Sequence, residues 1–314
     1  MKNLIKQTLI VLSSLIILFI SYGITGLLSK EEQLLPPYAC TGFAVYFNEP
    51  VYGMNFDYPP DIRVRLRIDE TGDMKAFHCG FDYNDNFAMV SGMNSAGMFS
   101  SNQILVPRLP GVAYSDRQEE EVYLWELHRN ALAYKDSVGP LRDWLATRKV
   151  IQSQNISLHV LLADKLGDAL IIEPGMKENR LTGIEHDYMV MTNFPVHSVK
   201  GYGYQKAEGV GADRFITAHE YILQHRQGFH HEQALELLEQ VAMREVDCMT
   251  RCSMVFDPVA GEILVALDRD FSRIWLVKLA AMTIETHKGF EKYCKLTFGI
   301  EGISFSQLKD CLSN

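Results

Sequence analysis

The chain has 314 residues, 47% of them apolar and 22% charged, a composition that fits a globular protein with a large core and excludes a disordered, collagenous or multi-span membrane protein. Its 30 Lys and Arg against 39 Asp and Glu give a net charge of −9, and no basic block could neutralise a run of phosphates, so nucleic acid is not expected as a partner. Six cysteines are too sparse for a disulfide scaffold, and Cys248 and Cys252 have no second pair at zinc-finger spacing, so a structural metal site is not expected either.

Residues 1–29 form an export element. Two lysines precede an uncharged stretch, residues 7–29, which is rich in Leu, Ile and Val and ends where charge returns at Lys30. The core of this stretch has the length of a signal peptide, while the whole stretch is long enough to span a bilayer as an anchor. Both interpretations stay open, and in either case the two lysines stay inside and the rest of the chain lies outside the cytoplasm.

Residues 30–39 form a short pro-segment or tether that leads to Cys40. A lipidated cysteine normally follows its apolar segment directly, and Cys40 lies well beyond it behind a poor lipobox, so lipidation is disfavoured. Residues 40–314 contain no repeat, low-complexity run or linker, and about 275 residues is within the range of one large domain.

Strands dominate the front of this domain, and in one of them apolar residues alternate strictly with Arg, which indicates a half-buried strand. The expected elements in chain order are strands at 41–47, 51–56 and 62–68, helices at 119–134 and 140–150, a hairpin of 157–163 and 168–173, helices at 213–224 and 231–244, and strands at 253–256, 262–267 and 274–279. Strand blocks separated by helix blocks indicate an α+β arrangement of layered sheets with helices outside, rather than a doubly wound βαβ repeat.

Cys40 follows a plausible processing junction, and cleavage there would place an α-amino group beside its thiol. If the chain is cut after Ala39, Cys40 becomes the first residue and carries its own α-amino group beside its thiol. A free α-amine titrates at about 7.7 to 8.0, so it can take the thiol proton without a distant histidine. On composition alone, a buried cysteine that opens a β-strand is the alternative.

Six motifs from Cys40 onward occur in an order that is hard to obtain by chance. They are Cys40-Thr41-Gly42, Gly53-Met54-Asn55-Phe56-Asp57, Gly92-Met93-Asn94-Ser95-Ala96-Gly97-Met98 followed by Asn102, Leu158-His159 through Asp164 with Gly167 and Glu173, Met191-Thr192-Asn193-Phe194-Pro195, and Asp213-Arg214-Phe215. In these motifs the sequence resembles the choloylglycine hydrolase family, whose bile salt hydrolases and penicillin V acylases are linear-amide hydrolases of the N-terminal nucleophile superfamily. The related acid ceramidase and penicillin-forming acyltransferase branches share parts of the pattern. The resemblance implies a four-layer αββα sandwich.

The resemblance also implies a role for each of five residues. Cys40 would attack an amide carbonyl, its α-amine would shuttle protons, and water would release the acyl-thioester. Asp57 would accept a hydrogen bond from the α-ammonium, and Arg214 would complete the charged network. Asn193 and Asn102 would donate their side-chain amides to the oxyanion. As alternatives, the Asp and Asn side chains would stabilise turns and the Arg would form an exposed ion pair.

One residue departs from the family pattern. The second motif carries Met54 where the family has Arg, so a cation expected beside the nucleophile is missing. We hypothesise that Arg63, Arg65 or Arg67, which share one strand face, partly replaces it, because a nearby cation favours the thiolate. A solvated Arg stripe is the alternative interpretation.

These observations predict an exported hydrolase that cleaves a small-molecule N-acyl amide through a Cys40 thioester, by a route that needs no metal and no organic cofactor. Two other functions stay open: an acyltransferase that passes the acyl group to an amine, and a non-catalytic domain anchored in the membrane through residues 7–29. The sequence also leaves open the acyl chain, the amine, the oligomeric state and whether Cys294 bridges to Cys311.

Overall fold

The described chain enters the fold through a hairpin of β1 (Thr41–Val45) and β2 (Val51–Tyr58). The computed structural model describes residues 39–83, 86–153, 156–175 and 177–313, all within the unit Tyr38–Asn314. The predicted signal peptide or anchor and all of the predicted pro-segment except Ala39 lie outside the described residues. Among the described helices, none is both long and apolar enough to cross a membrane.

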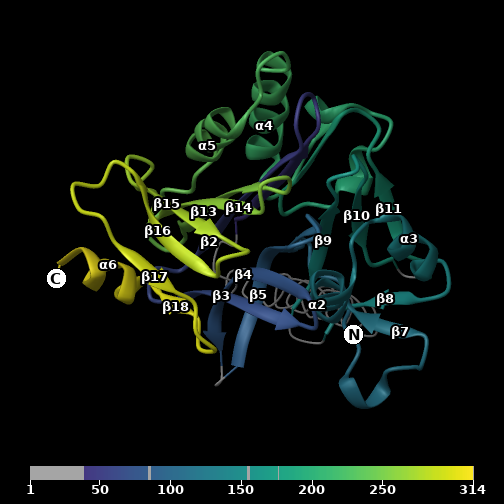
Figure 1. Cartoon of the computed structure of the whole chain (residues 1–314). Helices are drawn as coiled ribbons and strands as arrows, with labels where there is room; N and C mark the ends of the chain where they lie inside the picture. The colour runs from purple at the N-terminus through teal and green to yellow at the C-terminus, as the bar shows by residue number, and fades with distance from the viewer. Residues whose placement is uncertain (1–38, 84–85, 154–155, 176, 314) are drawn as a thin grey trace, which may run out of the picture. The chain divides into compact units, whose positions relative to one another are not determined.

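Two eight-stranded antiparallel sheets form the centre of the fold (Figure 1). The first sheet has the order β12-β1-β2-β13-β14-β15-β16-β17, in which the further strands are β12 (Tyr188–Met191), β13 (Met249–Asp257), β14 (Glu262–Leu267), β15 (Ile274–Lys278), β16 (Thr283–Lys288) and β17 (Lys295–Thr297). The second has the order β11-β10-β9-β6-β5-β4-β3-β18, with β11 (Arg180–Gly183), β10 (Ala169–Glu173), β9 (Leu158–Ala163), β6 (Phe99–Ile104), β5 (Asn86–Asn94), β4 (Met74–Tyr83), β3 (Val64–Thr71) and β18 (Ile303–Ser304).

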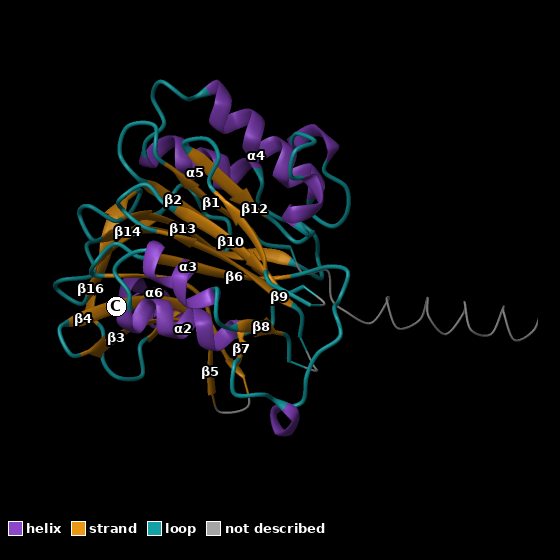
Figure 2. Ribbon diagram, turned by 90° about the vertical axis from the view of Figure 1, so that its right-hand side faces the viewer, coloured by secondary structure: helices purple, strands orange, loops and turns teal. Residues whose placement is uncertain are grey.

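Helices cover the outer faces of both sheets (Figure 2). On the first sheet, α5 (His231–Gln240) packs on β2 and β13, and α4 (Ala212–Gln224) packs on β1 and β12. On the second sheet, α2 (Leu124–Tyr134) packs across β4, β5, β6 and β9, and the apolar residues of α3 (Gly139–Leu145) join the same cluster. This stack confirms the predicted α+β fold, a four-layer αββα sandwich.

Aromatic side chains join the two sheets. Tyr52 of β2 stacks on Phe99 of β6 with ring centroids 5.1 Å apart, and Phe256 of β13 lies 5.0 Å from the same ring. All three rings are fully buried. Fully burying one large apolar side chain stabilises the fold by about 1.5 to 3 kcal/mol, so these rings are a main reason why the sheets stay together.

The C-terminal helix α6 (Phe305–Ser313) follows β18 directly. A disulfide links Cys294, which precedes β17, to Cys311 in α6, with the two Cα atoms 6.0 Å apart. The sequence left this pairing open. Because the bridge closes a loop of 17 residues, it restricts the unfolded chain and ties the C-terminus to the first sheet.

Several predicted boundaries are wrong by a few residues, for an identifiable reason. The helix predicted at 119–134 begins at Leu124, and the one predicted at 140–150 ends at Leu145. The residues lost from these helices form β7 (Glu121–Tyr123) and β8 (Lys149–Ile151), which pair in parallel. The backbone groups of β7 and β8 therefore form hydrogen bonds with each other and do not continue α2 and α3.

Candidate active site

Cys40 directly precedes β1, and both it and Ala39 are buried, with 4% and 3% of their surfaces exposed. The peptide N–H of Cys40 donates a hydrogen bond to Asn193 Oδ1 at 2.8 Å, and Cys40 Sγ lies 4.0 Å from the carbonyl oxygen of Asp57. Burial and the nearby Asp57 carboxylate raise the pKa of the Cys40 thiol. The thiol is therefore protonated in the uncut chain and needs a base before it can attack a carbonyl.

Asn193 and Arg214 hold the peptide group of Cys40. Asn193, just after β12, accepts the Cys40 N–H on Oδ1, accepts a second hydrogen bond there from Arg214 Nη2 at 2.9 Å, and donates through Nδ2 to the Ile104 carbonyl at 2.9 Å. Arg214, in the first turn of α4, donates through Nη1 to the Cys40 carbonyl and, at 2.9 Å, to Thr41 Oγ1. Because both Asn193 and Arg214 are buried, these charge-assisted hydrogen bonds fix the residue that carries the thiol.

The close approach of Arg214 depends on a glycine. Gly211, immediately before α4, has a φ of +81°, and a Cβ at this position would lie 2.4 Å from Arg214 Nη2. Its carbonyl accepts a hydrogen bond from Thr192 Oγ1 at 3.0 Å, which ties the start of α4 to the residue before Asn193. Only glycine both adopts this positive φ easily and leaves room for the Arg214 guanidinium. Gly211 therefore allows Arg214 to approach Cys40.

Asp57 lies on β2 and is fully buried. Thr250 Oγ1, on the neighbouring β13, donates to Asp57 Oδ1 at 2.5 Å, whereas Oδ2 has no hydrogen-bond partner among the described residues. Burial raises the pKa of Asp57 to about 7, although the Arg214 charge and the Thr250 hydrogen bond act in the opposite direction. Asp57 can therefore hold or release a proton near neutral pH, which suits a general base or acid.

Cys248 is a second thiol at the site, and sequence reasoning missed it. It is fully buried, and its thiol contacts the backbone of Ala39. Burial and the Asp57 charge raise the pKa of Cys248 to about 12, so it is a neutral thiol beside the Ala39–Cys40 bond. In the sequence, only its spacing to Cys252 drew attention.

Neutral side chains surround Met54, the residue that departs from the family pattern. Met54 lies opposite Gly42 in the β1–β2 register, is fully buried, and accepts a hydrogen bond on its sulfur from Ser101 Oγ at 3.0 Å. Gln103, with its amide oriented so that both atoms are satisfied, donates to the Cys40 carbonyl at 3.3 Å and accepts from the Gly42 N–H at 2.9 Å. The neutral amide of Gln103, from the second sheet, therefore contacts the Cys40 carbonyl next to Met54.

Asn102 does not join this cluster. Its neighbours in β6, Ser101 and Gln103, direct their side chains toward the first sheet, and side chains alternate along a strand, so Asn102 lies on the opposite face. That face also carries Ser100, whose hydroxyl pairs with His128 of α2 at 2.7 Å. Neither amide atom of Asn102 has a hydrogen-bond partner among the described residues, and the oxyanion role predicted for it has no support in this placement. The oxyanion role of Asn193 stays a prediction, because its Nδ2 donates to Ile104 in the uncut chain.

The arginines of β3 do not replace the missing cation, and this hypothesis is wrong. Arg65 pairs with Asp82 at 2.7 Å and Arg67 with Asp69 at 2.8 Å, on the partly exposed face of the strand. Arg63 precedes the strand and is exposed. The buried residues of β3 alternate with these arginines, as the half-buried strand prediction requires. The cation beside Cys40 is Arg214, which approaches from the helix layer.

The Leu158-His159 motif supports the site indirectly. Glu173 pairs with His159 Nδ1 at 3.2 Å between β10 and β9, and its carboxylate also accepts the backbone N–H groups of Val196 and His197 at 2.8 and 2.9 Å. These bonds fix the segment that follows Asn193. Among the described residues, no three His, Cys, Asp or Glu side chains lie close enough together to hold a metal ion.

Two facing antiparallel sheets between helix layers form a sandwich of the N-terminal nucleophile hydrolase fold, and the buried Cys40 precedes β1, which lies beside the edge strand β12. No protein-family model matches the sequence, and neither does any curated protein. Two variants of the conjugated bile acid hydrolase from Clostridium perfringens match in structure with TM-scores of 0.62 and 0.60, at 16% and 17% identity, over 84% and 83% of this chain and 99% of theirs. Penicillin V acylase from Agrobacterium tumefaciens matches with a TM-score of 0.58 at 13% identity, over 79% of this chain and 90% of its own. These likenesses confirm the predicted resemblance at the level of the fold.

Proposed function

We propose that the protein hydrolyses a linear, non-peptide amide of an N-acyl small molecule, with Cys40 as an N-terminal nucleophile. The observation that carries this proposal is the set of contacts on the Cys40 peptide group: its nitrogen is held by Asn193, its carbonyl by Arg214, and its thiol lies beside Asp57. A structural cysteine at the start of a strand has no need of a buried arginine on its carbonyl. The fold shared with amide hydrolases supports the same reaction class.

In the cut protein, the α-amine of Cys40 takes the thiol proton and Sγ attacks the amide carbonyl carbon of the substrate. The carbon–nitrogen bond then breaks, the leaving amine receives the proton from the α-ammonium, and the acyl group remains on Sγ as a thioester. Water, deprotonated by the α-amine, hydrolyses this thioester and releases the acid. Asn193 Oδ1, which accepts the Cys40 N–H, keeps that nitrogen in place through each step.

The uncut chain lacks this α-amine, so exposure of Cys40 needs another base. We infer that Asp57, whose pKa of about 7 allows it to accept a proton near neutrality, takes the thiol proton when Sγ attacks the Ala39 carbonyl. The Ala39–Cys40 peptide bond breaks as the thioester forms, and Asp57 passes the proton to the Cys40 nitrogen, which becomes an amine. Water then hydrolyses the thioester, which releases the upstream segment as a carboxylic acid and returns a proton to Sγ. The burial of Ala39 and Cys40 favours such self-processing over cleavage by an external protease, which needs an accessible bond.

Export to an extracytoplasmic compartment belongs to the same proposal. The Cys294–Cys311 disulfide supports it, because disulfides persist in oxidising compartments and are rare in the cytoplasm. The uncharged stretch at residues 7–29 would deliver the domain there, as a cleaved signal peptide or as an anchor. If it is an anchor, cutting after Ala39 releases the active domain from its covalent attachment to the membrane.

The test is a substrate panel with matched cysteine variants. Cut protein is incubated with penicillin V, a conjugated bile salt and an N-acyl amine, and the released acid is measured. We expect acid from at least one class, none from Cys40→Ala, and wild-type rates from Cys79→Ala, which removes a buried thiol from β4 in the second sheet. Acyl transfer to an added amine without acid formation would make the protein an acyltransferase. No turnover of any class by protein that begins with Cys40 would overturn the proposal.

A further inference from the structure

The strand that carries the partner of Asp57 contains one extra residue. β13 pairs with β2 so that Met249 lies opposite Tyr58 and Thr250 opposite Asp57, but the residue opposite Phe56 is Cys252. Arg251 is therefore unpaired in the ladder, which makes it a β-bulge. Bulges are frequent next to active sites because they redirect a side chain.

This bulge decides which face Thr250 occupies. In a regular strand, Thr250 and Cys252 would point to the same face, because side chains alternate with a period of two. With Arg251 inserted between them, Cys252 faces Cys79 of the second sheet in the core, while Thr250 turns to the opposite face and donates to Asp57. Removing the insertion would move either Thr250 away from Asp57 or the rest of β13 out of the core.

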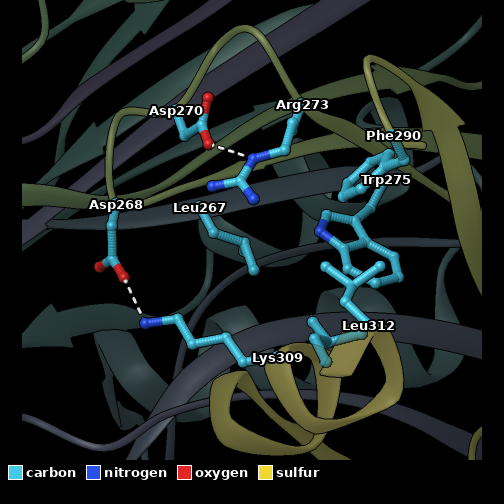
Figure 3. A pocket seen from close by; sticks show the side chains of 9 residues that line it. Leu267, Asp268, Asp270, Arg273, Trp275, Phe290, Lys309 and Leu312 are labelled. Atoms are coloured by element: carbon cyan, nitrogen blue, oxygen red, sulfur yellow. Dashed lines mark hydrogen bonds and ion pairs between the residues drawn. The ribbon is translucent and has the colours of Figure 1, made fainter. Parts of the chain in front are cut away.

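The side chain of Arg251 fixes the bulge to its surroundings. Its Nη1 donates to the carbonyl of Pro59 at 3.3 Å and to that of Pro60, in the segment directly after β2, and its Nε donates to Asp268 Oδ1 at 2.8 Å. The other oxygen of Asp268 pairs with Lys309 of α6 at 3.3 Å, as Figure 3 shows. The side chain of Arg251 is 11% exposed and that of Asp268 is 28% exposed, so the ion pair between them is partly shielded from water.

Asp268 is itself held in an uncommon backbone conformation. Its φ is +48°, and that of Arg269 is +65°, in the left-handed region that non-glycine residues rarely adopt. Such conformations persist where the surroundings over-determine them, and they are frequent at functional positions. The ion pairs to Arg251 and Lys309 hold the Asp268 carboxylate in place in this turn.

We propose that Arg251 is a positioning residue for the reaction: it pins the bulge in β13 and the turn after β2 so that the Thr250 hydroxyl stays on Asp57. It does not contact Cys40. The inference rests on the proposed function, in which Asp57 takes the thiol proton when the uncut chain cleaves itself after Ala39. Its consequence is that loss of Arg251 must change the acid–base behaviour of Asp57 in the same way as loss of the Thr250 hydroxyl.

The experiment compares Arg251→Ala, Thr250→Val and the double variant through the pH dependence of the rate of self-cleavage after Ala39, the step in which Asp57 takes the thiol proton. Because the Thr250 hydrogen bond lowers the pKa of Asp57, Thr250→Val moves the acid-side midpoint upward by about 0.5 to 1 pH unit, the worth of one hydrogen bond. Arg251→Ala moves the midpoint in the same direction, and the double variant has the same midpoint as Thr250→Val alone. The midpoint of Arg251→Lys lies between those of Arg251→Ala and the wild type. Arg273→Ala, which removes an exposed arginine paired with Asp270 in the neighbouring turn, leaves the midpoint unchanged.

A lowered Tm with a wild-type midpoint in Arg251→Ala would overturn the proposal, and so would shifts that add in the double variant. If Arg251→Ala does not fold, Asp268→Asn removes the ionic partner of Arg251 and serves the same comparison. An infrared titration of the Asp57 carboxyl, with Asp57→Asn to identify its band, reads the same shifts without turnover. Failure of wild-type protein to hydrolyse any amide would therefore refute the proposed function and still leave the Arg251 inference testable.

Discussion

Replacing Asp57 by Asn should make the protein more stable at neutral pH while it removes the proposed base. Asp57 is fully buried, and burial raises its pKa from 3.8 to about 7. Between these values the folded chain keeps a proton that the unfolded chain has released, so the free energy of unfolding falls as pH rises through this window. Between pH 5 and pH 8 the loss is about 3 kcal/mol, at 1.36 kcal/mol for each pKa unit.

Urea unfolding of Cys40→Ala and of Cys40→Ala/Asp57→Asn measures this loss, because the shared Cys40→Ala change keeps both chains uncut. The difference in the free energy of unfolding between the two proteins should grow by about 3 kcal/mol in favour of the Asn variant from pH 5 to pH 8. Other titrating groups cancel in the difference. A difference that stays constant over this range would show that Asp57 has an ordinary pKa, and it would remove our reason for assigning Asp57 as the base.

Two further predictions concern the charged and the buried polar groups. Arg214→Met removes the hydrogen bonds to the Cys40 carbonyl and Asn193, so we expect kcat to fall by about 100-fold. Arg214→Lys keeps the charge, so its kcat should fall less. Equal rates for the wild type and Arg214→Met in a single-turnover assay would contradict this role. Burial lowers the pKa of His78 to about 4 and that of His128 to about 3. At these two histidines the unfolded chain therefore binds more protons than the folded chain below about pH 6.5, so they should lower Tm as pH drops from 6.5 to 4.5, whereas Asp57 acts in the opposite direction. The fall should be smaller in His128→Gln, and an equal fall in both proteins would exclude His128 as a cause.

Much of the fold could be predicted because its signals are local. The alternation in β3, the helical periods of α4 and α5, and the turn at Gly167 between β9 and β10 are all readable from nearby residues, and each appears in the structure. The paired strands β4 and β5 were missed, because both contain glycine and polar residues that break the alternation of apolar side chains. Antiparallel pairing with each other and with the adjacent strands β3 and β6, rather than an alternation of side chains, makes these segments strands.

The order of the motifs predicted which residues would lie near Cys40, while the roles of these residues stay predictions. Cys40 and Arg214 are 174 residues apart, and the structure brings them into contact with Asn193 as the resemblance implied. Asn102 and Gln103 show the limit: they are adjacent in sequence, but only one strand face reaches the nucleophile, so an error of one residue changes the face. A bulge such as that at Arg251 has no sequence signal, because it is defined by the register between two strands.

The most direct test of the central claim is the intact mass of the protein species that hydrolyses amides, recovered from cells that express the full chain. We expect this species to begin at Cys40, with its α-amine free. In Cys40→Ala protein, the bond after residue 39 should remain intact. An active species that still carries Ala39 or any earlier residue would contradict the free-amine mechanism and, with it, the role of Cys40 as an N-terminal nucleophile.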